Sequence, residues 1–198
     1  GCVNDITGCV TSLILNEVDY DQPGSDDGEF VEFYNPLQGD SIPLQNLYLQ
    51  GVNGSNGDIY FEVHLAQEYP HLDDGAYLVI GDPGVIANLP DYVLSIEMPS
   101  SFSIQNGAPD GVRLIWKQDS GDTFIDGLAY EGEMGQSEGL PVGEGQSPTD
   151  EDNGDGSLGR CPNAGDTDSN ANDFAFTPIS TPGTSNNCDA SCDDNNAC

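Results

Sequence analysis

The chain has 198 residues, of which 36% are hydrophobic, and this is enough to bury one substantial core. Its 35 acidic side chains face only three basic ones, Arg113, Lys117 and Arg160, and the formal net charge is −32 at pH 7. This charge excludes nucleic acids and anionic membranes as partners, because proteins bind both through Lys and Arg. No run of 18 or more apolar residues occurs, so we expect no membrane insertion.

Short apolar runs separated by turn dipeptides extend from residue 13 to residue 130. Many alternate apolar and polar side chains, as in residues 59–65, and pairs such as Asp74-Gly75 stand between them. Alternation is typical of strands with one buried face, and Asp-Gly or Asn-Gly pairs suit tight reversals. The predicted strands are residues 13–18, 29–34, 44–50, 58–65, 77–81, 92–98, 112–117 and 123–130. They indicate an all-β fold, an antiparallel β-sandwich.

Residues 132–159 are rich in Gly, Glu and Asp, and apolar side chains return only at Leu158 and at Phe174. We therefore predict a long acidic loop over the sandwich rather than a linker. Loops of this length inside one domain are uncommon unless they are functional or held by a ligand. From residue 186 onward the only apolar residues are Ala and Cys, which predicts a separate cysteine-rich element.

Oxygen-bearing side chains recur at every second position from Asp166 to Asn172. Ca²⁺ takes about six to eight oxygen ligands, and D-x-D-x-N matches the start of a calcium loop. Ala171 and Thr177 stand where an EF-hand has Gly and Glu, so this is no EF-hand. The alternative is a solvated acidic turn. We predict a Ca²⁺ cofactor with the following ligands: Asp166, Asp168, Asn170, and either Asp173 or a backbone carbonyl.

The cysteines gather at the two ends of the chain, without the C-x₂-C pairs that zinc sites use. Disulfides persist in oxidising compartments, so we expect an extracellular or cell-surface protein. The cysteines that we expect to form disulfides are Cys2, Cys9, Cys161, Cys188, Cys192 and Cys198. Six cysteines allow about 15 pairings. We favour Cys161–Cys188, because these two flank the last expected strand and a bridge between them would hold the acidic stretch.

Other polar residues receive structural interpretations. Asn16 and Glu17 end an apolar strand, and we favour a capped, solvated turn over a second metal site for them and for Asp19, Asp21, Asp26 and Asp27. We expect Arg160 to form charge-assisted hydrogen bonds with carboxylates. Asn53-Gly54-Ser55 is a sequon for N-glycosylation on a turn.

Evidence for an enzyme is weak in the sequence. The two histidines, His64 and His71, lie near no candidate nucleophile, and no G-x-S-x-G motif is present. With so many carboxylates, a pair at the spacing of glycosidase acids arises by chance. We therefore predict no catalytic residues.

Several motifs occur in a characteristic order, among them Leu15-Asn16-Glu17-Val18 and the run from Gly28 to Pro36. The order ends with Gly156-Ser157-Leu158-Gly159-Arg160 and Thr181-Pro182-Gly183-Thr184-Ser185-Asn186. Together they resemble the lamin-tail-domain family, specifically its bacterial extracellular members. The resemblance covers residues 12–187 and implies an immunoglobulin-like β-sandwich that serves as an interaction or structural module without shared catalytic residues.

The two ends, residues 1–11 and 188–198, resemble halves of tandem cysteine-rich repeats of large bacterial surface proteins. This resemblance implies partners of the same kind, either further copies in a head-to-tail assembly or neighbouring repeats of a longer chain. We therefore predict a non-enzymatic extracellular structural or adhesive module, a calcium- and disulfide-stabilised unit of a surface protein or filament. The alternative is an accessory domain of a secreted hydrolase that binds a glycan or another polymer.

Overall fold

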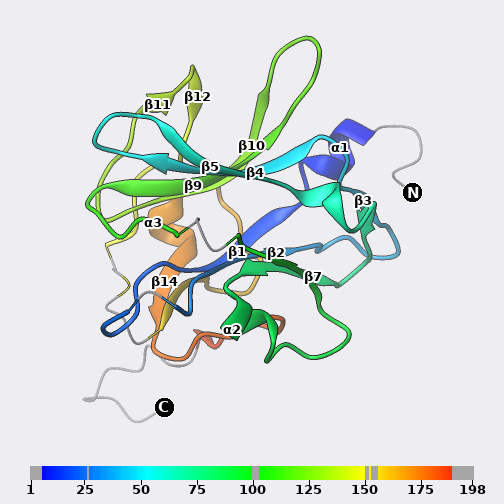
Figure 1. Cartoon of the computed structure of the whole chain (residues 1–198). Coiled ribbons are helices and arrows are strands. Elements are labelled where there is room, and N and C mark those ends of the chain that lie inside the picture. Colours follow the sequence, from blue (N-terminus) through cyan, green and yellow to red (C-terminus); the bar gives the residue numbers. More distant parts are fainter. Residues whose placement is uncertain (1–5, 26, 100–102, 150–151, 153–155, 189–198) are drawn as a thin grey trace.

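A computed structural model describes residues 6–25, 27–99, 103–149, 152 and 156–188. Two sheets form its body (Figure 1). The first has the strand order β14 (Phe174–Thr177), β13 (Ser157–Arg160), β1 (Ile14–Asp19), β2 (Phe30–Tyr34), β7 (Tyr77–Gly81), β8 (Leu94–Glu97). The second has the order β10 (Thr123–Tyr130), β9 (Asp110–Trp116), β4 (Leu47–Asn53), β5 (Ile59–His64).

Smaller elements lie around these sheets. Two short pairs are β3 (Ile42–Pro43) with β6 (His71–Leu72), and β11 (Gln136–Ser137) with β12 (Leu140–Pro141). The helices are α1 (Ile6–Val10), the 3₁₀ turn η1 (Leu65–Gln67), α2 (Pro83–Ile86) and α3 (Asn170–Asp173). None of the helices in the described part of the chain is long and apolar enough to cross a membrane.

The two sheets face each other across one hydrophobic core. Leu15 and Phe33 of the first sheet and Leu49 and Leu114 of the second are fully buried in it. The alternation of core residues along the strands explains why these segments form strands, since each must present one apolar face. The all-β sandwich prediction is confirmed at this level. Val10, which belongs to the predicted terminal piece 1–11, also lies in this core.

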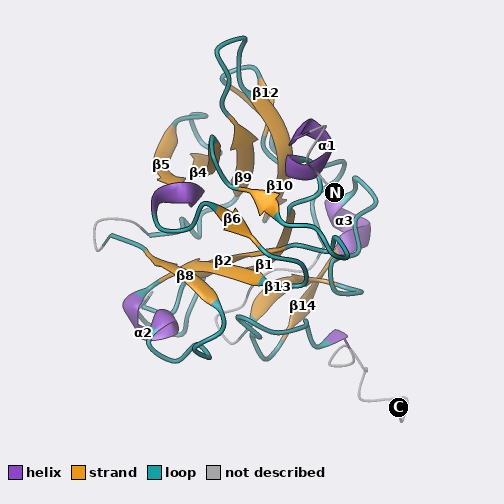
Figure 2. Ribbon diagram, turned by 90° about the vertical axis from the view of Figure 1, so that its right-hand side faces the viewer, coloured by secondary structure: helices purple, strands orange, loops and turns teal. Residues whose placement is uncertain are grey.

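All the predicted strands are present, with ends shifted by a few residues. The sheets are antiparallel except at one place, where β7 and β8 pair in parallel. This departure from the prediction arises because α2 connects the two strands and returns the chain in the same direction. Figure 2 shows α2 beside β8, and its Val85 and Ile86 pack against a small cluster of Phe30, Val79 and Val93.

Residues 136–142 of the predicted acidic loop lie on the outer face of the second sheet and include the β11–β12 hairpin. Arg113 of β9 holds it in place, with its Nη1 donating to the carbonyl oxygens of Ser137 at 3.0 Å and Pro141 at 3.0 Å. Glycines in the sheet make room for the loop, because a β-carbon at Gly111 would come within 2.6 Å of Val142. The predicted loop range also ends in a strand, β13, which forms part of the first sheet.

Candidate metal centre and the buried polar network beside it

Arg160, the last residue of β13, lies fully buried among carboxylates. Its Nε donates to the carbonyl oxygen of Leu15 at 2.8 Å and its Nη1 to that of Gly165 at 3.0 Å. The carboxylates around its guanidinium, with the shortest nitrogen–oxygen distances, are Asp126 (2.8 Å), Asp173 (3.0 Å), Asp166 (3.4 Å) and Glu144 (3.5 Å). The expected charge-assisted bonds of Arg160 are confirmed.

Asp126 joins the two sheets at this point. It follows an irregularity in the pairing of β10 with β9, and its Oδ2 accepts the backbone N–H of Leu15 in β1 at 2.8 Å. Burial raises the pKa of Asp126 to about 6, although the guanidinium of Arg160 favours its charged form. The ion pair of Asp126 with Arg160 therefore stabilises the contact between the sheets when the Asp126 carboxyl is ionised.

Glu144, Asp166 and Asp173 form a cluster, with one oxygen of each lying within 4.8 Å of the others. The Glu144 side chain is only 9% exposed, and its buried Oε2 has no hydrogen-bond partner. Burial, and after it the neighbouring carboxylates of Asp126 and Asp166, raise the pKa of Glu144 to about 8. An all-oxygen cluster of this kind suits a hard cation such as Ca²⁺.

Asp173 is held differently within the cluster. Burial alone would raise its pKa, but hydrogen bonds from Thr167 and Ser169, together with the charge of Arg160, hold the pKa below its usual value. Its Oδ2 accepts the N–H of Thr167 at 2.9 Å, and its Oδ1 accepts the Thr167 hydroxyl at 2.7 Å. Asp173 is thus a charged, fixed member of the cluster.

Of the three predicted carboxylate ligands, the structure brings Asp166 and Asp173 together in the cluster. Asn170 lies beside Glu144, and its Oδ1 already accepts the N–H groups of Ala129 at 3.3 Å and Glu144 at 3.0 Å. Asp168 is exposed and does not belong to the cluster. Sequence reasoning missed Glu144, which lies in the acidic loop without a distinguishing motif; only its contact with Asn170 places it here.

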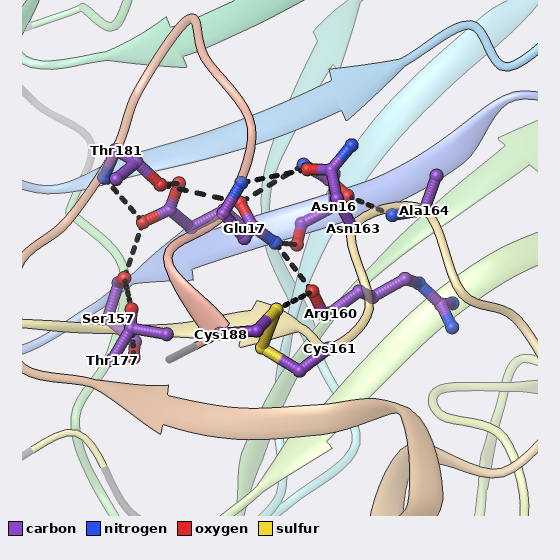
Figure 3. Close-up of a disulfide and its surroundings, with 11 residues drawn as sticks. Asn16, Glu17, Ser157, Arg160, Cys161, Asn163, Ala164, Thr177, Thr181 and Cys188 are labelled. Atoms are coloured by element: carbon purple, nitrogen blue, oxygen red, sulfur yellow. Dashed lines mark hydrogen bonds between the residues drawn. A yellow bond between two sulfur atoms is a disulfide. The ribbon is translucent and has the colours of Figure 1, made fainter. Parts of the chain in front are cut away.

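A second buried network lies on the outer face of the first sheet (Figure 3). Glu17 of β1 and Glu32 of β2 are cross-strand neighbours, and both are fully buried. Glu17 accepts hydrogen bonds from the N–H of Thr181 at 2.8 Å and the Ser157 hydroxyl at 2.5 Å. Glu32 accepts the N–H of Gly183 at 2.6 Å. The predicted solvated turn is therefore wrong for Asn16 and Glu17, because residues 181–186 cover this face of the sheet, and it is wrong for Asp19, which is buried as well.

Burial dominates the electrostatics of both carboxyls. It raises the pKa of Glu17, while the hydrogen bonds from Ser157 and Thr181 act in the opposite direction. It also raises the pKa of Glu32 well above its usual value, and the charge of Glu17 adds to the effect.

Asn16, also fully buried, and Asn186 extend this network toward the disulfide. Nδ2 of Asn186 donates to the carbonyl oxygens of Asn16 at 2.9 Å and Arg160 at 3.0 Å. Cys161 and Cys188 form a disulfide with their α-carbons 5.4 Å apart, which confirms the favoured pairing (Figure 3). Residues 181–188 are thus fastened to β1, β2 and β13 by hydrogen bonds and by one covalent bond.

The remaining cysteines are described only in part. Cys9 is buried and disulfide-bonded, and its partner lies outside the described residues. Cys2, Cys192 and Cys198 also lie outside them, as does Asp26.

Two other candidate positions have local partners. Nδ2 of Asn53, the atom that a glycan would modify, donates to Gln105 at 2.7 Å, and glycosylation stays a prediction. The rings of His64 and Tyr48 stack with their centroids 4.6 Å apart, and Lys117 lies 4.5 Å from the Tyr48 centroid. These contacts use the ring of Tyr48, which is the kind of surface a sugar would stack on.

Comparison with known proteins identifies no relative of this chain. No protein-family model matches the chain, and no curated protein matches it. The motifs that suggested a lamin-tail domain nevertheless meet in space, since Glu17, Ser157, Thr181 and Asn186 all belong to the buried network.

Proposed function

We propose that the chain is a non-enzymatic extracellular structural or adhesive module, a lamin-tail-like domain with an immunoglobulin-like sandwich, stabilised by Ca²⁺ and disulfides. In this proposal it is one unit of a surface protein or filament. Its partners are further copies of itself joined head to tail, or neighbouring repeats of a longer chain.

The way the end of the sandwich is anchored carries this proposal. Residues 181–188 lead directly into the cysteine-rich end, and they are bound to three strands through Glu17, Glu32 and Asn186 as well as through the Cys161–Cys188 disulfide. A module that transmits tension to a neighbour needs its ends fixed to the core in this manner. Buried carboxylates cost stability unless they are hydrogen-bonded, and here that bonding serves the anchorage.

Particle size with and without reductant tests the proposal. Head-to-tail contacts are heterologous, and those that do not close into a ring propagate as filaments. Native material should form extended particles in electron microscopy and size-exclusion chromatography, and reductant should shorten them. Monomers unaffected by reductant, together with binding to a polysaccharide array, would overturn the proposal in favour of a polymer-binding accessory domain.

A further inference from the structure

The buried Oε2 of Glu144 is the starting point, because it lacks the hydrogen bond that such an atom needs. Arg160 directs its Nη2 to Asp126 at 2.8 Å, and Glu144 receives only an ion-pair contact at 3.5 Å. A buried carboxylate oxygen without a donor is costly. One guanidinium thus faces four carboxylates, so negative charge is in excess here whenever they are ionised, and a bound cation would reduce that excess.

The neighbouring carboxylate oxygens could bind such a cation. Asp166 has a side chain that is 32% exposed, so the cluster is open to solvent on this side. Asp173 is fixed by its bonds to Arg160 and Thr167, and its Oδ1 accepts one hydroxyl and keeps a second lone pair. The cluster therefore offers one buried oxygen, one fixed oxygen and one accessible oxygen.

We infer that one Ca²⁺ binds between Glu144, Asp166 and Asp173, with water completing its coordination, and fastens the acidic loop to the segment that ends in α3. The choice of Ca²⁺ rests on the proposed extracellular function, whereas the ligand set rests on the geometry alone. Mg²⁺ fits less well, because it requires a near-ideal octahedron and gives up its water reluctantly.

Backbone hydrogen bonds already join the acidic loop to α3 beside the proposed ion. The N–H of Asn170 donates to the carbonyl oxygen of Glu144 at 2.8 Å, and that of Ala171 donates to Gln146 at 2.8 Å. An ion beside these bonds would cross-link two segments that are separated in sequence by β13. With only three carboxylates from the protein, affinity should fall in the range of extracellular calcium modules, a Kd of roughly 10⁻⁴–10⁻³ M.

Calorimetric titration of chelator-treated monomer with CaCl₂ and with MgCl₂ tests the site. We expect one Ca²⁺ per chain and weaker Mg²⁺ binding. Glu144→Gln should weaken Ca²⁺ binding by at least the roughly 10–100-fold that loss of an outer-shell group costs metal sites. Glu138→Gln is the matched control, because Glu138 is exposed in the same loop and the substitution is the same. It should bind Ca²⁺ as the wild type does.

Two outcomes would overturn the inference. Equal binding by Glu144→Gln and the wild type would remove Glu144 from the site, and equal losses in both variants would show only diffuse attraction of counterions. Folding of Glu144→Gln is checked in chelator, where it should melt no lower than the wild type because Gln keeps the size of the side chain and removes a carboxyl whose charged form burial disfavours. In hydrogen exchange, Ca²⁺ should slow residues 144–146 and 170–173 together in the wild type alone. These assays use monomer, so a negative result would refute the Ca²⁺ site without refuting the proposed assembly. A negative result in the assembly test would likewise leave the Ca²⁺ site standing.

Discussion

Replacing both cysteines of the Cys161–Cys188 bridge by alanine should lower the free energy of unfolding by an amount that follows from the loop it closes. The bridge spans 27 residues of sequence. For a loop of this length the chain-entropy model gives about 3.5 kcal/mol at 25 °C. In the native state, the hydrogen bonds of Thr181 and Asn186 would still hold the segment, so the effect falls on the unfolded chain.

Thermal and urea unfolding followed by circular dichroism measure this effect. For a domain of this size, a loss of about 3.5 kcal/mol corresponds to a decrease of roughly 7–14 °C in the melting temperature. Alanine substitution is preferable to reductant, because reductant would also attack the disulfide of Cys9. If the variant has a native-like spectrum and loses less than about 1 kcal/mol of unfolding free energy, the entropic reasoning is refuted. Such a result would indicate that the unfolded chain of the variant still holds the two ends of this loop close together.

Two further perturbations test the buried charges. Arg160→Lys keeps the charge but loses the planar guanidinium, and it should lower the free energy of unfolding in urea by roughly 3 kcal/mol. Lys117→Ala, which removes an exposed ion pair with Glu62, should lower it by less than about 1 kcal/mol. Equal losses in the two variants would contradict the role assigned to Arg160. The pH dependence should be the reverse of the usual acid denaturation: burial raises the pKa of Asp19 to about 9, and it also raises the pKa of Glu17. A folded pKa above the unfolded value gives stability that is complete below about pH 4 and is lost as the pH rises toward 9. The melting temperature in chelator should therefore fall across this range, and a constant or rising value would contradict the burial argument.

The strands were predictable because their signal is local. Residues 59–65 alternate apolar and polar side chains, and β5 occupies this range with Phe61 and Val63 in the core. The predicted set did not include β13, and the strand expected between Cys161 and Cys188, where β14 lies, was given no bounds, because four residues are too few for a period to show. β13 takes its place in the sheet by pairing with β1, which is distant in sequence, and β14 then pairs with β13.

Glu17 was misjudged because the first sheet is covered on both faces. Every residue of β1 is buried, since the second sheet covers one face and residues 181–186 cover the other. A rule that assigns the polar residues of a strand to solvent fails when a distant segment returns to supply hydrogen bonds. The sequence contained these partners, but only a resemblance between whole motifs could suggest that they meet.

The metal site stays a prediction, and the structure gathers its proposed carboxylates only in part for a geometric reason. A ligand at every second residue converges on an ion only if the chain curls around it. Here Asp168 has a positive φ of 55° and α3 begins at Asn170, so the backbone does not continue as one curled loop, and Asp168 lies outside the cluster. Glu144 enters instead through the backbone bonds that join its loop to α3, a contact that no local pattern could reveal.

The distribution of the three cations bears on how the proposed units could associate. Arg113 and Arg160 are buried and bonded within the chain, and Lys117 pairs with Glu62 at 2.7 Å. Two copies placed side by side would therefore bring like charges together, and this repulsion extends over about 8 Å at physiological salt. We expect filaments of the proposed kind to stay separate in chelator at low salt and to bundle as CaCl₂ is added. Electron microscopy of filament width would show the change, and bundles formed in chelator at low salt would contradict the role assigned to charge.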